Sequence, residues 1–219
     1  TVSFLESVLN QKKYHVGTFT SPHILRYNER IKINGIEIDD ESLLETFEMI
    51  DEVRGDTTLT YFEFATLSAF YLFSKSNLDV AVLEVGLGGR LDATNIVDSD
   101  ISIITSIGID HTEFLGNTID SIALEKAGVM RPFKTCIYAQ EKPPAALLKY
   151  AKNKSVNLLI HNNDYRVNLG SSNWSLKSKN NSINEIPNLK MIGDYQYNYA
   201  AASLLALDAI LPECLVDHD

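Results

Sequence analysis

Cysteine is scarce in this chain, and long apolar runs are missing. Its 219 residues include two cysteines, Cys136 and Cys214, which lie far apart and fit neither a metal-binding spacing nor a disulfide framework. The sequence has no signal-like start and no apolar run long enough to span a membrane. These absences predict a cytoplasmic protein with reduced thiols and no membrane contact.

Positive charge is also in short supply. Lysine and arginine total 19 against 29 aspartate and glutamate residues, which gives a net charge of −10. A broad nucleic-acid interface needs a basic face, so the composition argues against one. It leaves a nucleotide site open, because a few local cations and Mg²⁺ suffice there. The length suits one α/β domain with a substantial core.

Strand-like and helix-like segments alternate along the chain. Strands are predicted at 14–19, 80–85, 101–106, 135–139 and 158–161, with a hairpin over 31–38 around Asn34-Gly35. Helices are predicted at 1–12, 42–53, 60–74, 118–130, 144–152 and 200–210. This order predicts an α/β fold whose mostly parallel sheet has helices on both faces. Residues 162–190, rich in Asn and Ser, predict a small antiparallel excursion.

The segment Glu84 to Asn95 is the most informative for function. It reads Glu-Val-Gly-Leu-Gly-Gly-Arg-Leu-Asp-Ala-Thr-Asn and directly follows the apolar run Val80–Leu83. A carboxylate and a glycine-rich loop at the carboxyl end of a buried strand are typical of a ligand site in open α/β sheets. The same pattern is explained equally well by a tight, purely structural junction between strand and loop, with Arg90 exposed to solvent.

Motifs in a fixed order resemble folylpolyglutamate synthase and dihydrofolate synthase, members of the Mur ligase superfamily. Besides the Glu84–Asn95 loop they are Thr20-Ser21-Pro22-His23 with Asn28-Glu29-Arg30-Ile31, Asp110-His111-Thr112 with Leu115-Gly116, Ile122-Ala123-Leu124-Glu125-Lys126-Ala127-Gly128, and Gly193 with Gln196 and Asn198. In the last motif Tyr195 stands where the family has histidine. The resemblance implies the central, ATP-binding domain of such a ligase over residues 1–219, with a P-loop NTPase-like fold.

The resemblance also implies a metal site. Glu84 and His111 would bind Mg²⁺ on the nucleotide phosphates, and Ser21 would add its hydroxyl. Without the family, His111 is more simply a loop histidine bonded to backbone, and Ser21 a turn cap. Lys126 would carry a carbamate formed with CO₂, although a lone helical lysine is usually a solvated charge. Lys126, Glu84 and His111 are therefore the expected catalytic residues.

Further residues would bind the organic substrates. By resemblance the pterin pocket is lined by Thr60, Tyr61, Phe62, Glu63, Leu91, Asp92 and Ala93. Thr60-x-x-Glu63 also has the form of a helix-capping box, and for Glu63 the structural role is favoured. Gln196 and Asn198 match residues that contact the nucleotide.

The reaction implied is ATP-dependent ligation of L-glutamate to dihydropteroate or to a folate glutamate tail through an acyl phosphate. The expected partners are these small molecules, and the chain is expected to be a monomer without nucleic-acid contact. The alternatives are a peptidoglycan Mur ligase with a UDP-muramyl substrate and a non-catalytic, decayed domain. No G-x-x-G-K-[ST]-like loop occurs in these residues, so we expect a phosphate-binding loop upstream of Thr1 and a C-terminal domain beyond Asp219.

Overall fold

The computed structural model of the chain describes residues 1–179 and 181–215. They form two compact units, each described separately. The first unit comprises residues 2–87 and 92–97, and the second comprises residue 1, residues 88–91 and the chain from 98 onward. Within the described residues, no helix is both long and apolar enough to cross a membrane.

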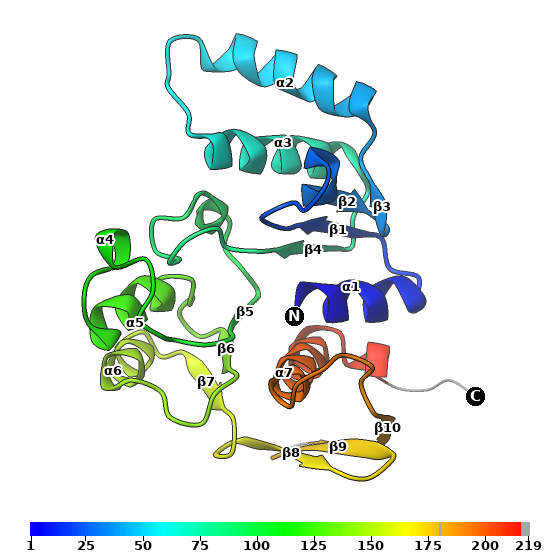
Figure 1. Cartoon of the computed structure of the whole chain (residues 1–219), viewed down its shortest axis with the longest axis vertical. Helices are drawn as coiled ribbons and strands as arrows, with labels where there is room; N and C mark the ends of the chain where they lie inside the picture. The colour runs from blue at the N-terminus through cyan, green and yellow to red at the C-terminus, as the bar shows by residue number, and fades with distance from the viewer. Residues whose placement is uncertain (180, 216–219) are drawn as a thin grey trace. The chain divides into compact units, whose positions relative to one another are not determined.

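The first unit is built around a four-stranded sheet (Figure 1). Its elements are α1 (Val2–Gln11), β1 (Val16–Phe19), η1 (Tyr27–Arg30, a 3-10 turn), β2 (Ile31–Ile33), β3 (Ile36–Glu37), α2 (Asp40–Arg54), α3 (Tyr61–Lys75), β4 (Val80–Leu83) and the 3-10 turn η2 (Ala93–Ile96). The strand order is β3-β2-β1-β4, with β1 antiparallel to β2 and parallel to β4. The two neighbouring parallel strands therefore end at the same edge of the sheet.

Local sequence signals explain the elements of the first unit. The predicted hairpin is confirmed: Asn34 and Gly35 take φ values of 54° and 77° and join β2 to β3. Asp39 caps α2 by accepting a hydrogen bond from the Ser42 amide. Buried apolar side chains of β1, β2, α2 and α3 form the core of this unit, among them Phe19, Ile31, Leu43, Ala65, Ala69, Leu72 and Phe73.

The second unit contains a parallel and an antiparallel sheet. Its elements are β5 (Ile101–Ile104), α4 (Thr112–Leu115), α5 (Ile119–Ala127), β6 (Thr135–Tyr138), α6 (Ala145–Asn153), β7 (Asn157–Ile160), β8 (Tyr165–Leu169), β9 (Asn173–Ser178), β10 (Ser182–Pro187), α7 (Tyr195–Ile210) and the 3-10 turn η3 (Pro212–Leu215). Strands β5, β6 and β7 are parallel, with α5 and α6 packed on one side and α7 on the other (Figure 1). Strands β8, β9 and β10 form the antiparallel sheet.

The predicted α/β class and the predicted antiparallel excursion are confirmed. The expected mostly parallel sheet is instead divided, because the parallel strands belong to two separate sheets, one of which also contains antiparallel pairs. Two elements also differ from the sequence-based expectation. Strand β10 was not predicted, because Ser182–Pro187 is polar, largely exposed and ends in proline, as suits an edge strand. Helix α7 begins at Tyr195 instead of Ala200, because Tyr197 contributes an aromatic contact with Trp174 that the apolar pattern did not reveal.

Candidate active site

Glu84 and Ser21 lie together at the carboxyl ends of the parallel strands β1 and β4. Phe19 pairs with Leu83 at the last position of the ladder, and the Glu84 amide donates to the Phe19 carbonyl at 2.9 Å. The Ser21 amide donates to Glu84 Oε2 at 2.7 Å, which fixes the half-buried carboxylate. The structure thus brings two of the predicted metal ligands together, with the oxygen donors that a hard cation such as Mg²⁺ prefers.

Asp92 organises the loop that follows Glu84. Its Oδ2 accepts hydrogen bonds from the amides of Gly86 and Leu87 at 3.0 and 2.9 Å. Its Oδ1 accepts from the Thr94 amide at 3.0 Å and from the Thr94 hydroxyl at 2.6 Å. Asp92 therefore has a structural role, and the substrate contact that the family resemblance implies for it stays a prediction. Leu91 is 80% exposed, and Ala93 begins η2.

The glycine-rich loop is also attached to the carboxyl end of α5, within the second unit. Arg90 forms an ion pair with Glu125, with Nη2 2.8 Å from Oε1, and the Arg90 amide donates to the Glu125 carbonyl at 2.8 Å. A Cβ added at Gly128 would lie 2.4 Å from the Arg90 Cα. Gly128 therefore permits backbone to approach backbone, and Arg90 is not simply a solvated charge. Sequence reasoning gave Glu125 no role, although it stands inside a motif.

His111 and Lys126 belong to the second unit. His111 precedes α4 in a left-handed conformation with φ 47°, its side chain is 57% exposed, and its Nε2 lies 3.7 Å from Asp110 Oδ2. Lys126 lies in the last turn of α5, half-buried, and no carboxylate of the described residues lies within 4.0 Å of its ammonium group. The roles that the family resemblance implies for His111 and Lys126 stay predictions.

No metal site made wholly of protein is found in the part of the chain that the structure describes. No three histidine, cysteine, aspartate or glutamate side chains gather there as a metal would require. Magnesium takes one or two protein carboxylates and leaves its other positions to phosphate and water. The pair Ser21–Glu84 fits that mode of binding.

The segment Thr60–Glu63 opens α3 with the predicted capping box. Thr60 Oγ1 accepts from the Glu63 amide at 3.2 Å, and Glu63 Oε2 accepts from the Thr60 amide at 2.7 Å, which holds the pKa of Glu63 below its usual range. Phe62 turns toward the core, 5.6 Å from the Phe19 ring, whereas Tyr61 is 59% exposed. Of the two aromatic residues, Tyr61 is the one free to contact a flat ligand.

Gln196 and Asn198 lie in the first turns of α7, and both are half-buried. Tyr195, in the place of the family histidine, is 56% exposed, and its ring lies 5.8 Å from that of Tyr199. The tyrosine in place of histidine therefore does not prevent α7 from starting here, but it changes the side chain at the first position of the helix.

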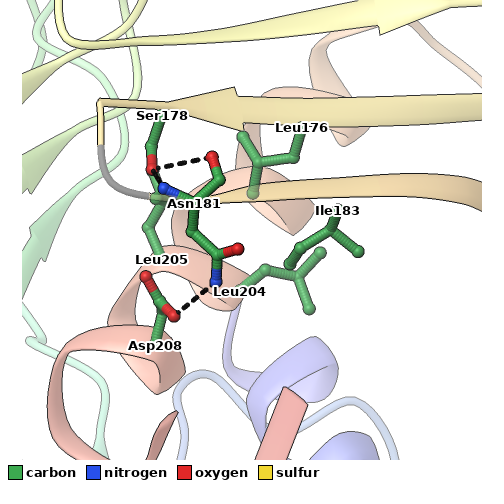
Figure 2. Close-up of a pocket in the computed structure, with 7 residues that line it drawn as sticks. All are labelled: Leu176, Ser178, Asn181, Ile183, Leu204, Leu205 and Asp208. Atoms are coloured by element: carbon green, nitrogen blue, oxygen red, sulfur yellow. Dashed lines mark hydrogen bonds between the residues drawn. The ribbon is translucent and has the colours of Figure 1, made fainter. Parts of the chain in front are cut away.

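A small cavity of the second unit is lined by none of these residues. It is formed by β9, β10 and α7, where Asn181 Nδ2 donates to Asp208 Oδ1 at 2.9 Å (Figure 2). Its lining residues are Leu176, Ser178, Asn181, Ile183, Leu204, Leu205 and Asp208. None of them is a predicted site residue, so this cavity is not the candidate active site.

The family is decided by a match to the model of the Mur ligase middle domain, which covers residues 6–207. The chain belongs to the Mur ligase middle-domain family. Within that family it is 41% identical over 187 residues to the dihydrofolate synthase/folylpolyglutamate synthase of Escherichia coli K12, covering 85% of the chain and 44% of the relative. The Bacillus subtilis enzyme of that name is 36% identical, and the match covers 95% of the chain and 51% of the relative. The chain thus spans about half the length of these Mur ligase relatives.

Solved structures of Mur ligase relatives show the same fold. The E. coli FolC complex with DHPP and ADP matches all of the chain and 51% of the solved chain, with a TM-score of 0.90 and 38% identity. A bifunctional folylpolyglutamate synthase/dihydrofolate synthase with Mn, AMPPNP and L-glutamate bound matches 99% of the chain and 51% of its own, with a TM-score of 0.85 and 38% identity. These likenesses confirm the resemblance that the sequence motifs indicated.

Proposed function

We propose that this chain is the ATP-using domain of a ligase that joins L-glutamate to dihydropteroate or to the glutamate tail of a folate. The observation that carries the proposal is the likeness to the E. coli FolC complex with DHPP and ADP. The Ser21–Glu84 pair at the ends of β1 and β4 supplies the matching chemistry at the sheet edge where α/β proteins bind ligands.

The proposed reaction has two steps. A substrate carboxylate oxygen bonds to the γ-phosphorus of ATP, and the bond from that phosphorus to the bridging oxygen breaks, so ADP leaves and an acyl phosphate forms. The amino nitrogen of L-glutamate then attacks the acyl carbon, loses a proton, and expels phosphate from a tetrahedral intermediate. Catalysis of this kind depends mainly on positioning and on neutralising phosphate charge.

The chain's own residues would bind and orient the reactants. Glu84 and Ser21 would hold Mg²⁺, which neutralises phosphate charge when bound. The family resemblance assigns the same role to His111. Gln196 and Asn198 would contact the nucleotide. Tyr61 would contact the flat heterocycle, and the family resemblance assigns the same contact to Leu91, Asp92 and Ala93. A relative with Mn and AMPPNP bound supports the assignment of a nucleotide and a divalent metal.

Lys126 would carry a carbamate, which replaces a cation by an anion close to the nucleotide. The support is its place in the Glu-Lys-Ala-Gly motif and the absence of a carboxylate partner among the described residues. Supplying ¹³C-bicarbonate should give a carbamate signal in carbon NMR that Lys126→Arg abolishes. A spectrum without that signal at saturating bicarbonate would refute the modification.

We also propose a monomeric protein in the cytoplasm. Cys136 is a buried free thiol whose pKa burial raises to about 12, so it is an inert packing residue that fits a reducing compartment.

Substrate-dependent ADP release by the full-length gene product tests the proposal. Dihydropteroate with L-glutamate and Mg²⁺ should stimulate release, whereas a UDP-muramyl peptide should not. Stimulation by the muramyl peptide alone would assign the chain to peptidoglycan synthesis. No release with any acceptor would favour a decayed domain.

A further inference from the structure

Arg30 is a buried cation close to the ends of β1 and β4. It is 7% exposed and closes the turn η1 just before β2. Its carbonyl accepts a hydrogen bond from the Thr20 amide at 2.8 Å, one residue before Ser21. The arginine is thus anchored beside the loop that carries a predicted metal ligand.

The guanidinium group contacts nitrogen and aromatic rings, with no carboxylate. Its Nε donates to His23 Nδ1 at 2.8 Å, and its central carbon lies 5.2 Å from the Tyr61 ring centre and 5.7 Å from that of Tyr27. Across residues 1–179 and 181–215, no carboxylate oxygen lies within 4.0 Å of it. A guanidinium carries five N–H donors, and among the described residues only the Nε–H of Arg30 has an acceptor, so the donors on its two terminal nitrogens are unused there.

The neighbouring acidic groups cannot supply the missing counter-charge. Burial, together with Tyr61, raises the pKa of Tyr27 to about 12, so its hydroxyl stays neutral at physiological pH. The carboxylate of Glu29 is occupied by the amides of Ile24, Leu25 and Arg26, each at 2.7 Å. Cation–π contacts with the two tyrosines compensate only part of the cost of burying this charge.

The unused donors remain accessible. Among the described residues, the fully buried and unpaired side-chain atoms are His161 Nδ1 and Asn188 Oδ1, so the terminal nitrogens of Arg30 keep some exposure. Tyr61 beside them is 59% exposed, and the capping box fixes its backbone at the start of α3. Free charged donors therefore stand next to a fixed, open aromatic ring.

We propose that Arg30 is a ligand-contacting residue whose free guanidinium N–H groups donate to an oxo or carboxylate oxygen of an aromatic ligand lying against Tyr61. The inference deepens the proposed function, on which it rests, by naming the residue that recognises the oxygen. Aromatic rings contact the face of a guanidinium, whereas hydrogen bonds use its edge, so both contacts can form together.

Fluorescence-monitored binding to the 219-residue chain tests this role. The probes are 6-hydroxymethylpterin, which carries a ring oxygen without a carboxylate, and p-aminobenzoylglutamate, which carries carboxylates without a pterin. Arg30→Lys keeps the charge but loses the planar set of donors, and it should weaken binding of one probe about 10- to 100-fold, the range for a lost charge-assisted hydrogen bond. The probe that is weakened identifies the oxygen.

A matched control separates this effect from a general loss of charge. Arg26 lies in the same segment, is exposed and pairs with Asp40 at 3.0 Å. Arg26→Lys should leave both binding constants unchanged. Thermal melting of each variant verifies folding, and ¹⁵N-arginine NMR of the unaltered chain gives a readout without any substitution, because the Arg30 side-chain resonances should shift when the probe binds.

The outcomes are distinguishable. If the unaltered chain binds neither probe, the pterin pocket of the proposed function fails and this inference fails with it. If the chain binds a probe, but Arg30→Lys binds it equally well and the Arg30 resonances do not shift, then the inference is overturned and the proposed function stands.

Discussion

At the scale of single residues, Glu84 is the carboxylate proposed to bind Mg²⁺ at the carboxyl ends of β1 and β4. Its carboxylate accepts one hydrogen bond from the Ser21 amide and belongs to no apolar core. Glu84→Ala in the full-length gene product should lower ADP release by about two orders of magnitude or more, as the loss of an electrostatic stabiliser does. Melting temperature should change little.

Glu84→Gln is the control for that loss. It keeps an oxygen that accepts from the Ser21 amide but removes the negative charge. Activity near the parent level in Glu84→Gln would show that the charge is not needed and would contradict the metal assignment.

His161 predicts a specific loss of stability in acid. It follows β7, is 7% exposed, and its Nδ1 has no partner within the described residues. Burial lowers its pKa, against a smaller opposing effect of Glu141. The unfolded chain therefore takes up a proton first as the pH falls below about 6.5, and the native state loses stability from there downward.

Urea unfolding of the parent and of His161→Phe at pH 7.5 and 5.5 measures this effect. The variant should lose less unfolding free energy between the two pH values than the parent does. Equal losses would mean that His161 takes no part in the pH dependence.

At the scale of an element, the capping box determines how firmly α3 begins. Thr60 and Glu63 satisfy each other's backbone amides. Thr60→Ala should lower the unfolding free energy by about 0.5–2 kcal/mol, whereas Thr60→Ser should not, because serine keeps the accepting hydroxyl. Urea unfolding at neutral pH distinguishes them. If both variants were equally stable, the Thr60 side chain would not stabilise the start of α3, and only its proposed ligand contact would remain.

The junction between the glycine-rich loop and α5 depends on Gly128. Its φ of −59° is open to any residue, so the effect of a side chain there is purely steric. Gly128→Ala places a Cβ 2.4 Å from the Arg90 Cα and should cost about 1–3 kcal/mol of unfolding free energy. Gly108, with nothing within 4 Å of an added Cβ, is the control, and alanine there should cost nothing.

At the scale of the whole molecule, the negative net charge predicts that the chain does not bind DNA. With a net charge of −10 it should show no anisotropy change with labelled duplex DNA at physiological salt. Non-specific DNA-binding proteins have dissociation constants of about 10⁻⁴–10⁻⁶ M under those conditions. A saturable rise in anisotropy that added salt reverses would contradict this prediction, because it would show that the chain has a local basic surface despite its negative net charge.

Local signals in the sequence determined the elements and their order. The Asn34-Gly35 turn, the Thr60-x-x-Glu63 box and the alternation of short apolar strands with helices act over a few residues, so the sequence displays them directly. The motifs also placed the chain in its family. The start of α7 and the edge strand β10 were not predicted correctly, since packing against Trp174 stabilises both.

Tertiary structure decided which groups meet. Ser21 and Glu84 are 63 residues apart, and Arg90 and Glu125 are 35 apart, so no local pattern reveals either contact. The burial of Arg30 against Tyr27 and Tyr61, without a carboxylate among the described residues, is equally invisible in the sequence. Periodicity reports which face of an element is apolar, whereas the partner of a buried charge depends on how strands and helices pack in three dimensions.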